Sequence, residues 1–233
     1  MTLEILPASI QYWDNCLYGG VPVFGTNKTS DVLHIDSDSL RRFVQTRHHL
    51  RPLGDVYYQE LYTLPMTGWS VLELGSGVGF DSLYFAEHGA TITACDVVPS
   101  NVKVTQKVLE PYEAKVVLLN TYDDILQLGT FDMIYSHGCL HHIPDDTVSG
   151  VVSILCSVLK PGGIALVLVY TKFFYPSVNY HASFGHPEGP FARGYTKAEL
   201  VDLFGPTMRL ETFRILNSDT FAWALFRKIK QDE

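Results

Sequence analysis

The sequence predicts an α/β fold: a doubly wound, mostly parallel sheet of the Rossmann-like type. From Trp69 onward, short apolar runs alternate with stretches of helical period, which is the pattern of parallel strands joined by crossover helices. A glycine-rich turn follows the first apolar run, at the position where such sheets bind ligands. The 233 residues, 46% of them hydrophobic, are enough to bury one full core.

Five apolar runs predict the strands of the parallel part of the sheet, and the stretches between most of them predict its helices. The predicted strands are Ser70–Leu74, Thr91–Cys95, Lys115–Leu119, Phe131–Tyr135 and Ile164–Tyr170, and the predicted helices are Gly79–His88, Ser100–Tyr112 and Asp145–Leu159.

The last part of the core is predicted from turn and cap residues. Pro161-Gly162-Gly163 should stop the preceding helix, because Pro cannot continue the helical hydrogen bonds and Gly accepts left-handed angles. A helix near Thr196–Phe204 is predicted to begin with Thr196 as its N-cap and Glu199 three residues on. The apolar runs Met208–Ile215 and Thr220–Ile229 have no long helix between them, so we expect them to pair antiparallel.

Two segments stand outside this alternation and predict the domain organisation. Residues 1–66, rich in Tyr, Gly and His, are expected to form an N-terminal helical cover or lid, and residues 67–233 the core. Residues 171–195 are rich in aromatics and predict a lid inserted in that core. The alternative is a plain cover for the sheet edge and a long packed loop.

Composition narrows the class of partner. A net charge of −8 argues against nucleic acid, which requires clustered Lys and Arg. The four cysteines are far apart, which indicates neither a metal-ligand pair nor a disulfide framework and suggests a reducing, cytoplasmic setting. The N-terminus lacks a signal-peptide pattern, and the longest apolar run is too short to span a bilayer, so we expect a soluble protein without a membrane partner.

The most informative stretch is Val71–Phe80, an apolar strand that enters a glycine-rich turn and opens a helix. Its glycines let the backbone approach a ligand closely. Asp96 ends the next strand about 20 residues on, where a carboxylate can accept hydrogen bonds from both hydroxyls of a ribose. Together the two features predict a nucleotide-like ligand, with a packed turn that binds nothing as the alternative.

The same stretch discriminates between two such ligands. Phe80 stands where the dinucleotide fingerprint has its third glycine, which weakens a pyrophosphate site. Glu73 lies two residues before Gly75, and its carboxylate would repel a pyrophosphate but attract the ammonium and sulfonium groups of S-adenosylmethionine. The charge pattern therefore favours the sulfonium.

These residues resemble the class I S-adenosylmethionine-dependent methyltransferases of the small-molecule type, over about Trp69 to Ile229. The resemblance rests on Val71–Gly79, on Asp96, on Phe131–Pro144, which is similar to the family's fourth strand and following loop, and on Leu159–Gly163, which is similar to the turn before its fifth strand. It implies a seven-stranded sheet with the last strand antiparallel, S-adenosyl-L-methionine as cofactor, and methyl transfer to a small molecule.

The resemblance also implies which residues hold the cofactor: the glycine turn binds the methionine and adenosyl portions, and Asp96 binds the ribose. One stretch departs from the family, because Asn120–Asp124 replaces the Gly-Asp-Ala-like residues of many relatives. This stretch either contacts the adenine or forms an exposed turn of polar, solvated residues. The predicted cofactor contacts are Glu73, Gly75, Ser76, Gly77, Gly79, Asp96, Val97, Thr121, Tyr122, Asp123 and Ser136.

Methyl transfer from a sulfonium is an in-line displacement, so positioning dominates and a general base helps with some acceptors. His137 and His141 follow the fourth strand and are the candidate catalytic bases. His142 precedes an Ile-Pro pair, as in many relatives, so the resemblance implies a hydrogen bond that orders the loop. His142 is also a candidate substrate contact. No metal is predicted: the histidine pairs at 48–49 and 141–142, and His181 with His186, lack ligand spacing and a completing carboxylate.

The acceptor is predicted to be an aromatic or apolar small molecule with an O, N, S or C nucleophile. Aromatic walls exclude water and stack on a flat substrate, and an arginine can pair with an anionic group, although the same aromatics also suit packing of a loop. The predicted acceptor contacts are Tyr57, Tyr58, His142, Phe173, Tyr175 and Arg193.

Three rival functions share the predicted sheet. Glu73 and Phe80 argue against an NAD(P)-dependent oxidoreductase, and the acidic composition argues against a methyltransferase acting on RNA. A non-catalytic module that senses the cofactor stays open, as does the choice between monomer and homodimer.

Overall fold

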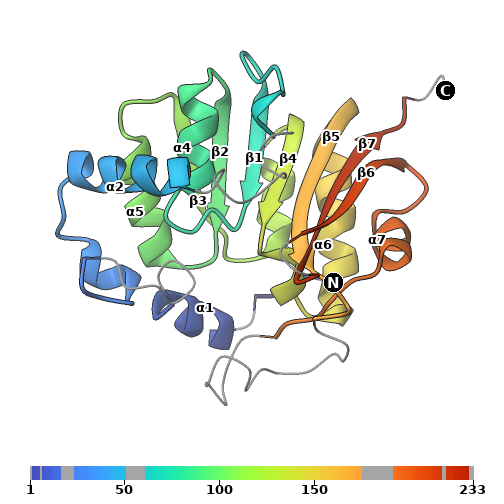
Figure 1. Ribbon diagram of the computed structural model, residues 1–233, viewed down its shortest axis with the longest axis horizontal. Coiled ribbons are helices and arrows are strands. Elements are labelled where there is room, and N and C mark those ends of the chain that lie inside the picture. The colour runs from blue at the N-terminus through green and yellow to red at the C-terminus, as the bar shows by residue number, and fades with distance from the viewer. Residues whose placement is uncertain are drawn as a thin grey trace. The chain divides into compact units, whose positions relative to one another are not determined.

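The computed structural model describes residues 2–5, 7–16, 24–50, 61–174, 191–216 and 219–230 (Figure 1). The strands of its seven-stranded sheet follow the order β3 (Ala114–Leu118), β2 (Thr91–Asp96), β1 (Ser70–Leu74), β4 (Phe131–His137), β5 (Leu159–Tyr170), β7 (Phe221–Lys228) and β6 (Met208–Leu216). Strand β7 runs antiparallel to both β5 and β6. The predicted fold class, including the antiparallel last strand, is therefore confirmed.

The chain divides into two compact units, one of Leu6–Leu119 and one of Met1–Ile5 with Asn120–Glu233. The first unit contains α1 (Pro7–Asp14), the 3-10 helix η2 (Thr29–Val32), α2 (Ser37–Leu50), β1 (Ser70–Leu74), α4 (Phe80–Glu87), β2 (Thr91–Asp96), α5 (Pro99–Leu109) and β3 (Ala114–Leu118).

In this first unit β2 pairs in parallel with both β1 and β3, and α4 and α5 are the crossover helices. Val71, Leu72 and Leu74 on β1 are at most 1% exposed, as expected for a parallel strand covered on both faces. Pro99 begins α5, where its fixed φ suits a first helical turn and its missing N–H has no helical partner to lose. The predicted strands and helices of this unit are confirmed to within three residues at each end.

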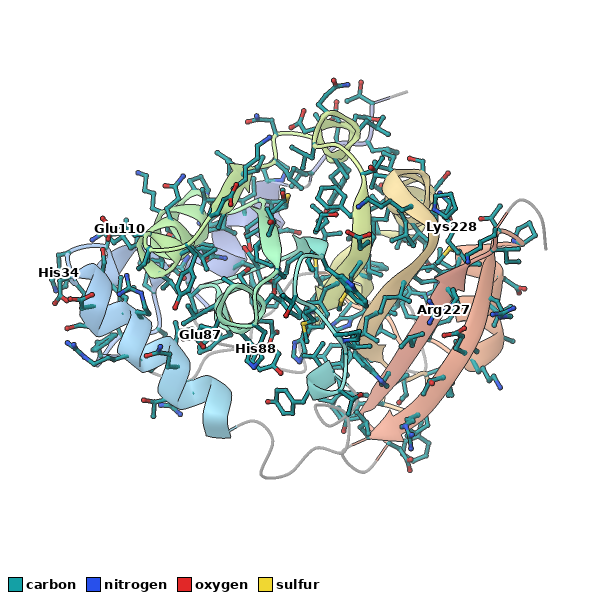
Figure 2. All side chains as sticks on the ribbon, turned by 90° about the horizontal axis from the view of Figure 1, so that it is seen from above. His34, Glu87, His88, Glu110, Arg227 and Lys228 are labelled. Atoms are coloured by element: carbon teal, nitrogen blue, oxygen red, sulfur yellow. The ribbon has the colours of Figure 1, made fainter. Side chains whose placement is uncertain are left out.

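The N-terminal part of the first unit packs on the crossover helices. Helix α2 contacts α4 and α5. The Arg41 guanidinium donates to the Val108 carbonyl at 3.1 Å, and the Gln45 amide donates to the Glu87 carboxylate at 2.6 Å. Glu87 lies at the end of α4, next to His88 (Figure 2). Helix α2, within the segment expected to form the cover, thus packs on two helices, and the role of residues 1–66 as a cover stays a prediction.

The second unit holds the remaining strands. Strand β5 pairs in parallel with β4 and antiparallel with β7, and β7 pairs antiparallel with β6. Its elements are the 3-10 helix η4 (Tyr122–Gln127), β4 (Phe131–His137), the 3-10 helix η5 (Leu140–His142), α6 (Asp145–Val158), β5 (Leu159–Tyr170), α7 (Lys197–Phe204), β6 (Met208–Leu216) and β7 (Phe221–Lys228).

Two predictions in this unit concern helix ends, namely the start of α7 and the end of α6. Thr196 caps α7 as predicted, because its hydroxyl accepts the Glu199 N–H and the Glu199 side chain accepts the Thr196 N–H. Helix α6 ends at Val158, but the Pro161-Gly162-Gly163 run belongs to β5. The pairing of β5 with β4 jumps over this run, from Leu159 directly to Ile164, so the run forms an irregularity within the strand rather than a turn before it.

Among the described residues, no helix is both long and apolar enough to cross a membrane. None of the four cysteines, all of which lie in the described part of the chain, forms a disulfide bond.

Candidate active site

The glycine turn in the first unit joins β1 to α4. Gly75, Gly77 and Gly79 have φ angles of 79°, 56° and 84°, in the left-handed region that glycine adopts without strain. The N–H groups of Gly75 and Ser76 both donate to the Cys95 carbonyl, at 2.8 and 3.0 Å. The turn is therefore anchored to the end of β2, next to Asp96.

Asp96 ends β2 and is only 6% exposed. Its Oδ2 accepts the Gly77 N–H at 2.8 Å, and its Oδ1 accepts the Val98 N–H at 2.9 Å and the Asn101 amide at 3.3 Å. Burial raises the pKa of Asp96, against the lowering effect of these hydrogen bonds. The structure thus brings together the glycine turn and the carboxylate that the sequence paired for nucleotide binding.

Glu73, on β1 before the turn, is 3% exposed. Its carboxylate accepts a hydrogen bond from the hydroxyl of Ser82 on α4. Val97 is half-buried and directly follows Asp96. Both residues lie beside the turn, and their contact with a cofactor stays a prediction.

In the second unit the predicted adenine contacts lie at the start of η4. Tyr122 is 7% exposed, and its N–H donates to the Leu3 carbonyl. Asp123 Oδ2 accepts the Leu3 N–H at 2.8 Å, and Glu4 forms an antiparallel bridge with Thr121. The alternative of an exposed turn does not fit Tyr122, because the N-terminal residues 2–5 pair with this stretch.

His141 lies in η5 after β4 and is 1% exposed. Its Nδ1 accepts the Tyr170 N–H at 3.1 Å, and the two rings are 3.9 Å apart. Burial, and then the neighbouring His142 and His137, hold the pKa of His141 well below its usual value. The imidazole is therefore neutral, with its proton on Nε2 and its Nδ1 lone pair engaged.

His142 and Arg193 tie the residues before α7 to the loop after β4. His142 Nδ1 donates to the Phe191 carbonyl at 2.8 Å, and the Arg193 N–H donates to the His141 carbonyl at 3.0 Å. The predicted loop-ordering hydrogen bond of His142 is thus confirmed, and its contact with substrate stays a prediction.

Arg193, predicted to pair with an acceptor, makes ion pairs within its own unit. Its Nη1 contacts Asp145 and its Nη2 contacts Glu199 at 3.3 Å, while its guanidinium lies 4.4 Å from the ring centre of Tyr195. An acceptor anion would have to compete with these carboxylates.

The remaining predicted residues fall into two groups. Ser136 is buried and His137 half-buried at the end of β4, and Phe173 is 79% exposed after β5. Three predicted acceptor contacts, Tyr57, Tyr58 and Tyr175, lie outside the described residues, as do His181, His186 and residues 175–190 of the expected lid. In the described part of the chain, no group of three or more His, Cys, Asp or Glu side chains could hold a metal ion.

The sequence reasoning did not single out three polar residues around the glycine turn: Ser82, Asn101 and Thr105. They are 0%, 7% and 0% exposed. A signal was available in α5, where Asn101 and Thr105 are one helical turn apart among buried valines. Polar side chains at buried helix positions require partners, so their position pointed to a contact beyond the helix.

The chain is similar to known methyltransferases in sequence. A family model described as a methyltransferase domain matches residues 71–163. The ubiquinone biosynthesis O-methyltransferase of Xanthomonas euvesicatoria pv. vesicatoria (strain 85-10) is 34% identical over 121 residues, which cover 50% of this chain and 48% of that protein. The chain spans about half the length of the curated relatives it matches.

Solved structures of low identity share the fold. Magnesium protoporphyrin IX methyltransferase from Synechocystis PCC 6803 has a TM-score of 0.62 at 18% identity, covering 94% of this chain and 97% of that one. The 1,6-didemethyltoxoflavin-N1-methyltransferase of Burkholderia thailandensis has a TM-score of 0.59 at 22% identity, covering 87% of each chain. The matched methyltransferase domain contains the glycine turn and Asp96, and the solved methyltransferases share the fold of this chain.

Proposed function

We propose that this protein binds S-adenosyl-L-methionine and transfers its methyl group to a small-molecule acceptor. The observation that carries the proposal is the hydrogen bond between the Asp96 carboxylate and the Gly77 N–H, inside the segment that matches the methyltransferase domain. This bond connects the carboxylate that is predicted to bind the ribose hydroxyls with the turn that is predicted to hold the rest of the cofactor.

The residues present fit this cofactor. A Cβ added at Gly77 would meet nothing within 4 Å, so the backbone of the turn is open to a close ligand. The buried acids Glu73 and Asp96 favour a cation over a pyrophosphate. When bound, the cofactor supplies an electrophilic methyl on a sulfonium. Gly75, Ser76, Gly77, Gly79 and Asp96 would hold it, with Glu73, Val97, Thr121, Tyr122, Asp123 and Ser136 as further contacts.

We propose that the acceptor is aromatic or apolar, with oxygen as the favoured nucleophile. The name of the curated relatives, O-methyltransferase, supports oxygen. Tyr170, Phe174 and Phe221 support an aromatic surface: the ring centres of Phe174 and Phe221 lie 5.7 and 5.2 Å from that of Tyr170. Of the two candidate bases, His137 suits a hydroxyl acceptor better, because the Nδ1 lone pair of His141 is engaged and its Nε2 carries the proton.

We propose that residues 171–195 form a lid that closes over the bound acceptor. This lid is part of a core of residues 67–233, and residues 1–66 form its cover. The exposure of Phe173 and Phe174, 79% and 46%, supports this role. Replacing both with Ala should raise the Michaelis constant of the acceptor and leave cofactor affinity within about tenfold. The acidic composition supports a small molecule as partner rather than nucleic acid, and the dispersed cysteines support a cytoplasmic setting, in which we propose a monomer or a homodimer.

The function is tested by calorimetry with S-adenosylmethionine, S-adenosylhomocysteine, NAD and NADP, followed by transfer of a labelled methyl group to a panel of phenols, catechols, amines and thiols. We expect both adenosyl compounds to bind more tightly than either dinucleotide, and label to appear in an aromatic hydroxyl acceptor. Tighter binding of a dinucleotide would contradict the cofactor. Binding without turnover across the whole panel would favour a sensor.

A further inference from the structure

Two polar side chains of α5, Asn101 and Thr105, lie on one face of the helix because they are four residues apart. Both are buried, at 7% and 0% exposed. A threonine inside a helix commonly bonds the carbonyl four residues before it. The Thr105 hydroxyl instead donates at 2.9 Å to the carbonyl of Gly77, which lies 28 residues earlier in the chain.

Thr105 also fills the space beside the last glycine of the turn. A Cβ added at Gly79 would lie 3.2 Å from Thr105 Cγ2 and 3.3 Å from its Oγ1. The residue therefore contacts the turn twice, with its hydroxyl at Gly77 and its methyl at Gly79.

Asn101 acts on the same turn through Asp96. Its amide donates to Asp96 Oδ1 at 3.3 Å, and Asp96 Oδ2 accepts the Gly77 N–H at 2.8 Å. Gly77 is thus held on both sides: Asp96 accepts from its N–H, and Thr105 donates to its carbonyl.

Such restraint matters for glycine, which loses more conformational freedom on ordering than any other residue. A turn containing Gly75, Gly77 and Gly79 that is already held in its left-handed conformations has less entropy to lose when a ligand binds. An unrestrained turn would lose that entropy at the binding step.

We propose that Thr105 and Asn101 are positioning residues for cofactor binding, which act through Gly77 and Asp96 to keep the glycine turn in its binding conformation. The inference rests on the proposed function, since it takes S-adenosylmethionine as the ligand of the turn. It adds to that function two residues of α5 and a second role for Asp96, as the residue that holds the turn itself.

The test compares four variants with the wild-type protein: two at Thr105, a matched control at Val104, and Asn101→Ala. Thr105→Val keeps the shape of the side chain and removes the donor to Gly77, and Thr105→Ser keeps the donor and removes the methyl. Val104→Ala is the matched control, because Val104 is 1% exposed on the same helix and is not among the nearest atoms that an added Cβ would meet at Gly77 or Gly79.

With S-adenosylhomocysteine in calorimetry, Thr105→Val should bind about three- to tenfold more weakly, the range for one lost neutral hydrogen bond. The Michaelis constant for S-adenosylmethionine should rise by the same factor, with kcat at saturating cofactor unchanged. Thr105→Ser should bind within about twofold of wild type, and Val104→Ala should lower thermal stability without weakening binding. Asn101→Ala should weaken binding in the same direction as Thr105→Val.

A second readout needs no ligand. In the free protein, amide exchange at Gly77 and Gly79 should be faster in Thr105→Val than in wild type, and unchanged in Val104→Ala. If wild type binds the cofactor and Thr105→Val binds equally well, the positioning role is wrong and the proposed function stands. If Val104→Ala weakens binding as much as Thr105→Val does, then Thr105 contributes to binding only through the packing of the helix. If wild type binds no adenosyl compound, the proposed function fails and the positioning role for that ligand fails with it.

Discussion

Asp96 is the residue on which the candidate cofactor site depends most. A carboxylate that is 6% exposed needs hydrogen bonds to remain stable, and Gly77, Val98 and Asn101 supply them. The same bonds orient the carboxylate. Asp96 therefore stabilises the turn before any ligand binds, which a position at the end of a strand does not by itself indicate.

Replacing Asp96 with Ala should weaken binding of S-adenosylhomocysteine by about 1.5–3 kcal/mol, the range for hydrogen bonds to a charged group. It should also lower the melting temperature, because three donors lose their acceptor. Calorimetry and thermal melting measure the two effects. Asp132→Ala is the control, since Asp132 pairs with Lys160 at a half-exposed position on β4. An unchanged dissociation constant in folded Asp96→Ala would refute the ribose role.

His141 should make stability depend on pH. The folded state keeps it neutral because burial lowers its pKa well below 6.5, whereas the unfolded chain takes up a proton below about 6.5. Stability is therefore complete above about pH 6.5 and is lost as pH falls towards the folded pKa, by up to about 1.4 kcal/mol per pH unit.

Urea denaturation between about pH 5.5 and 7 measures this slope. His141→Gln should flatten it, and His34→Gln, at an exposed position, should leave it as in wild type. The same slope in His141→Gln and wild type would show that His141 is not the titrating group.

At the scale of elements, the end of α6 is held by a residue from β7. The Lys228 ammonium donates to the carbonyls of Cys156 and Leu159, at 2.7 and 2.6 Å. The last carbonyls of a helix have no partner within it and carry partial negative charge, so a lysine there satisfies both needs. Arg227, the neighbour of Lys228 on β7 (Figure 2), donates to Gly162 at 2.9 Å within the irregular part of β5. Strand β7 thus stabilises the whole passage from α6 into β5.

Lys228→Met should lower the free energy of unfolding by about 1–2 kcal/mol, because it removes a charged cap and keeps the length of the side chain. The urea midpoint reports the change. Lys230→Met, two residues on at an exposed position, should cost less than about 0.5 kcal/mol. Equal losses in the two variants would contradict a specific cap.

At the scale of the whole molecule, cofactor binding should raise the free energy of unfolding. Every predicted cofactor contact requires the folded sheet, so a ligand that binds there stabilises the folded state alone. The net charge of −8 also favours a cationic ligand over a dinucleotide at long range.

S-adenosylhomocysteine at about 100 times its dissociation constant should raise the stability of the protein by about 2.7 kcal/mol. Thermal melting at increasing ligand concentration follows the change, and NADP at equal concentrations should leave the melting temperature unchanged. A rise with NADP as large as that with S-adenosylhomocysteine would contradict the predicted preference. Asp96→Ala should require a higher concentration of S-adenosylhomocysteine for the same rise.

The sequence by itself determined the fold class, the strands and helices of the core, and the pairing of the glycine turn with Asp96. These follow from local causes: apolar periodicity selects strand or helix, and glycine selects left-handed turns. The contacts of Thr105 with Gly77, of Tyr170 with His141, of Leu3 with Asp123 and of Lys228 with α6 were decided by the tertiary structure. Each joins residues far apart in the chain, and local propensity carries no information on which distant group will satisfy a buried donor or acceptor. The tertiary structure also decided the state of His141, which the sequence made a candidate base. Burial keeps its imidazole neutral, and its Nδ1 accepts the Tyr170 N–H.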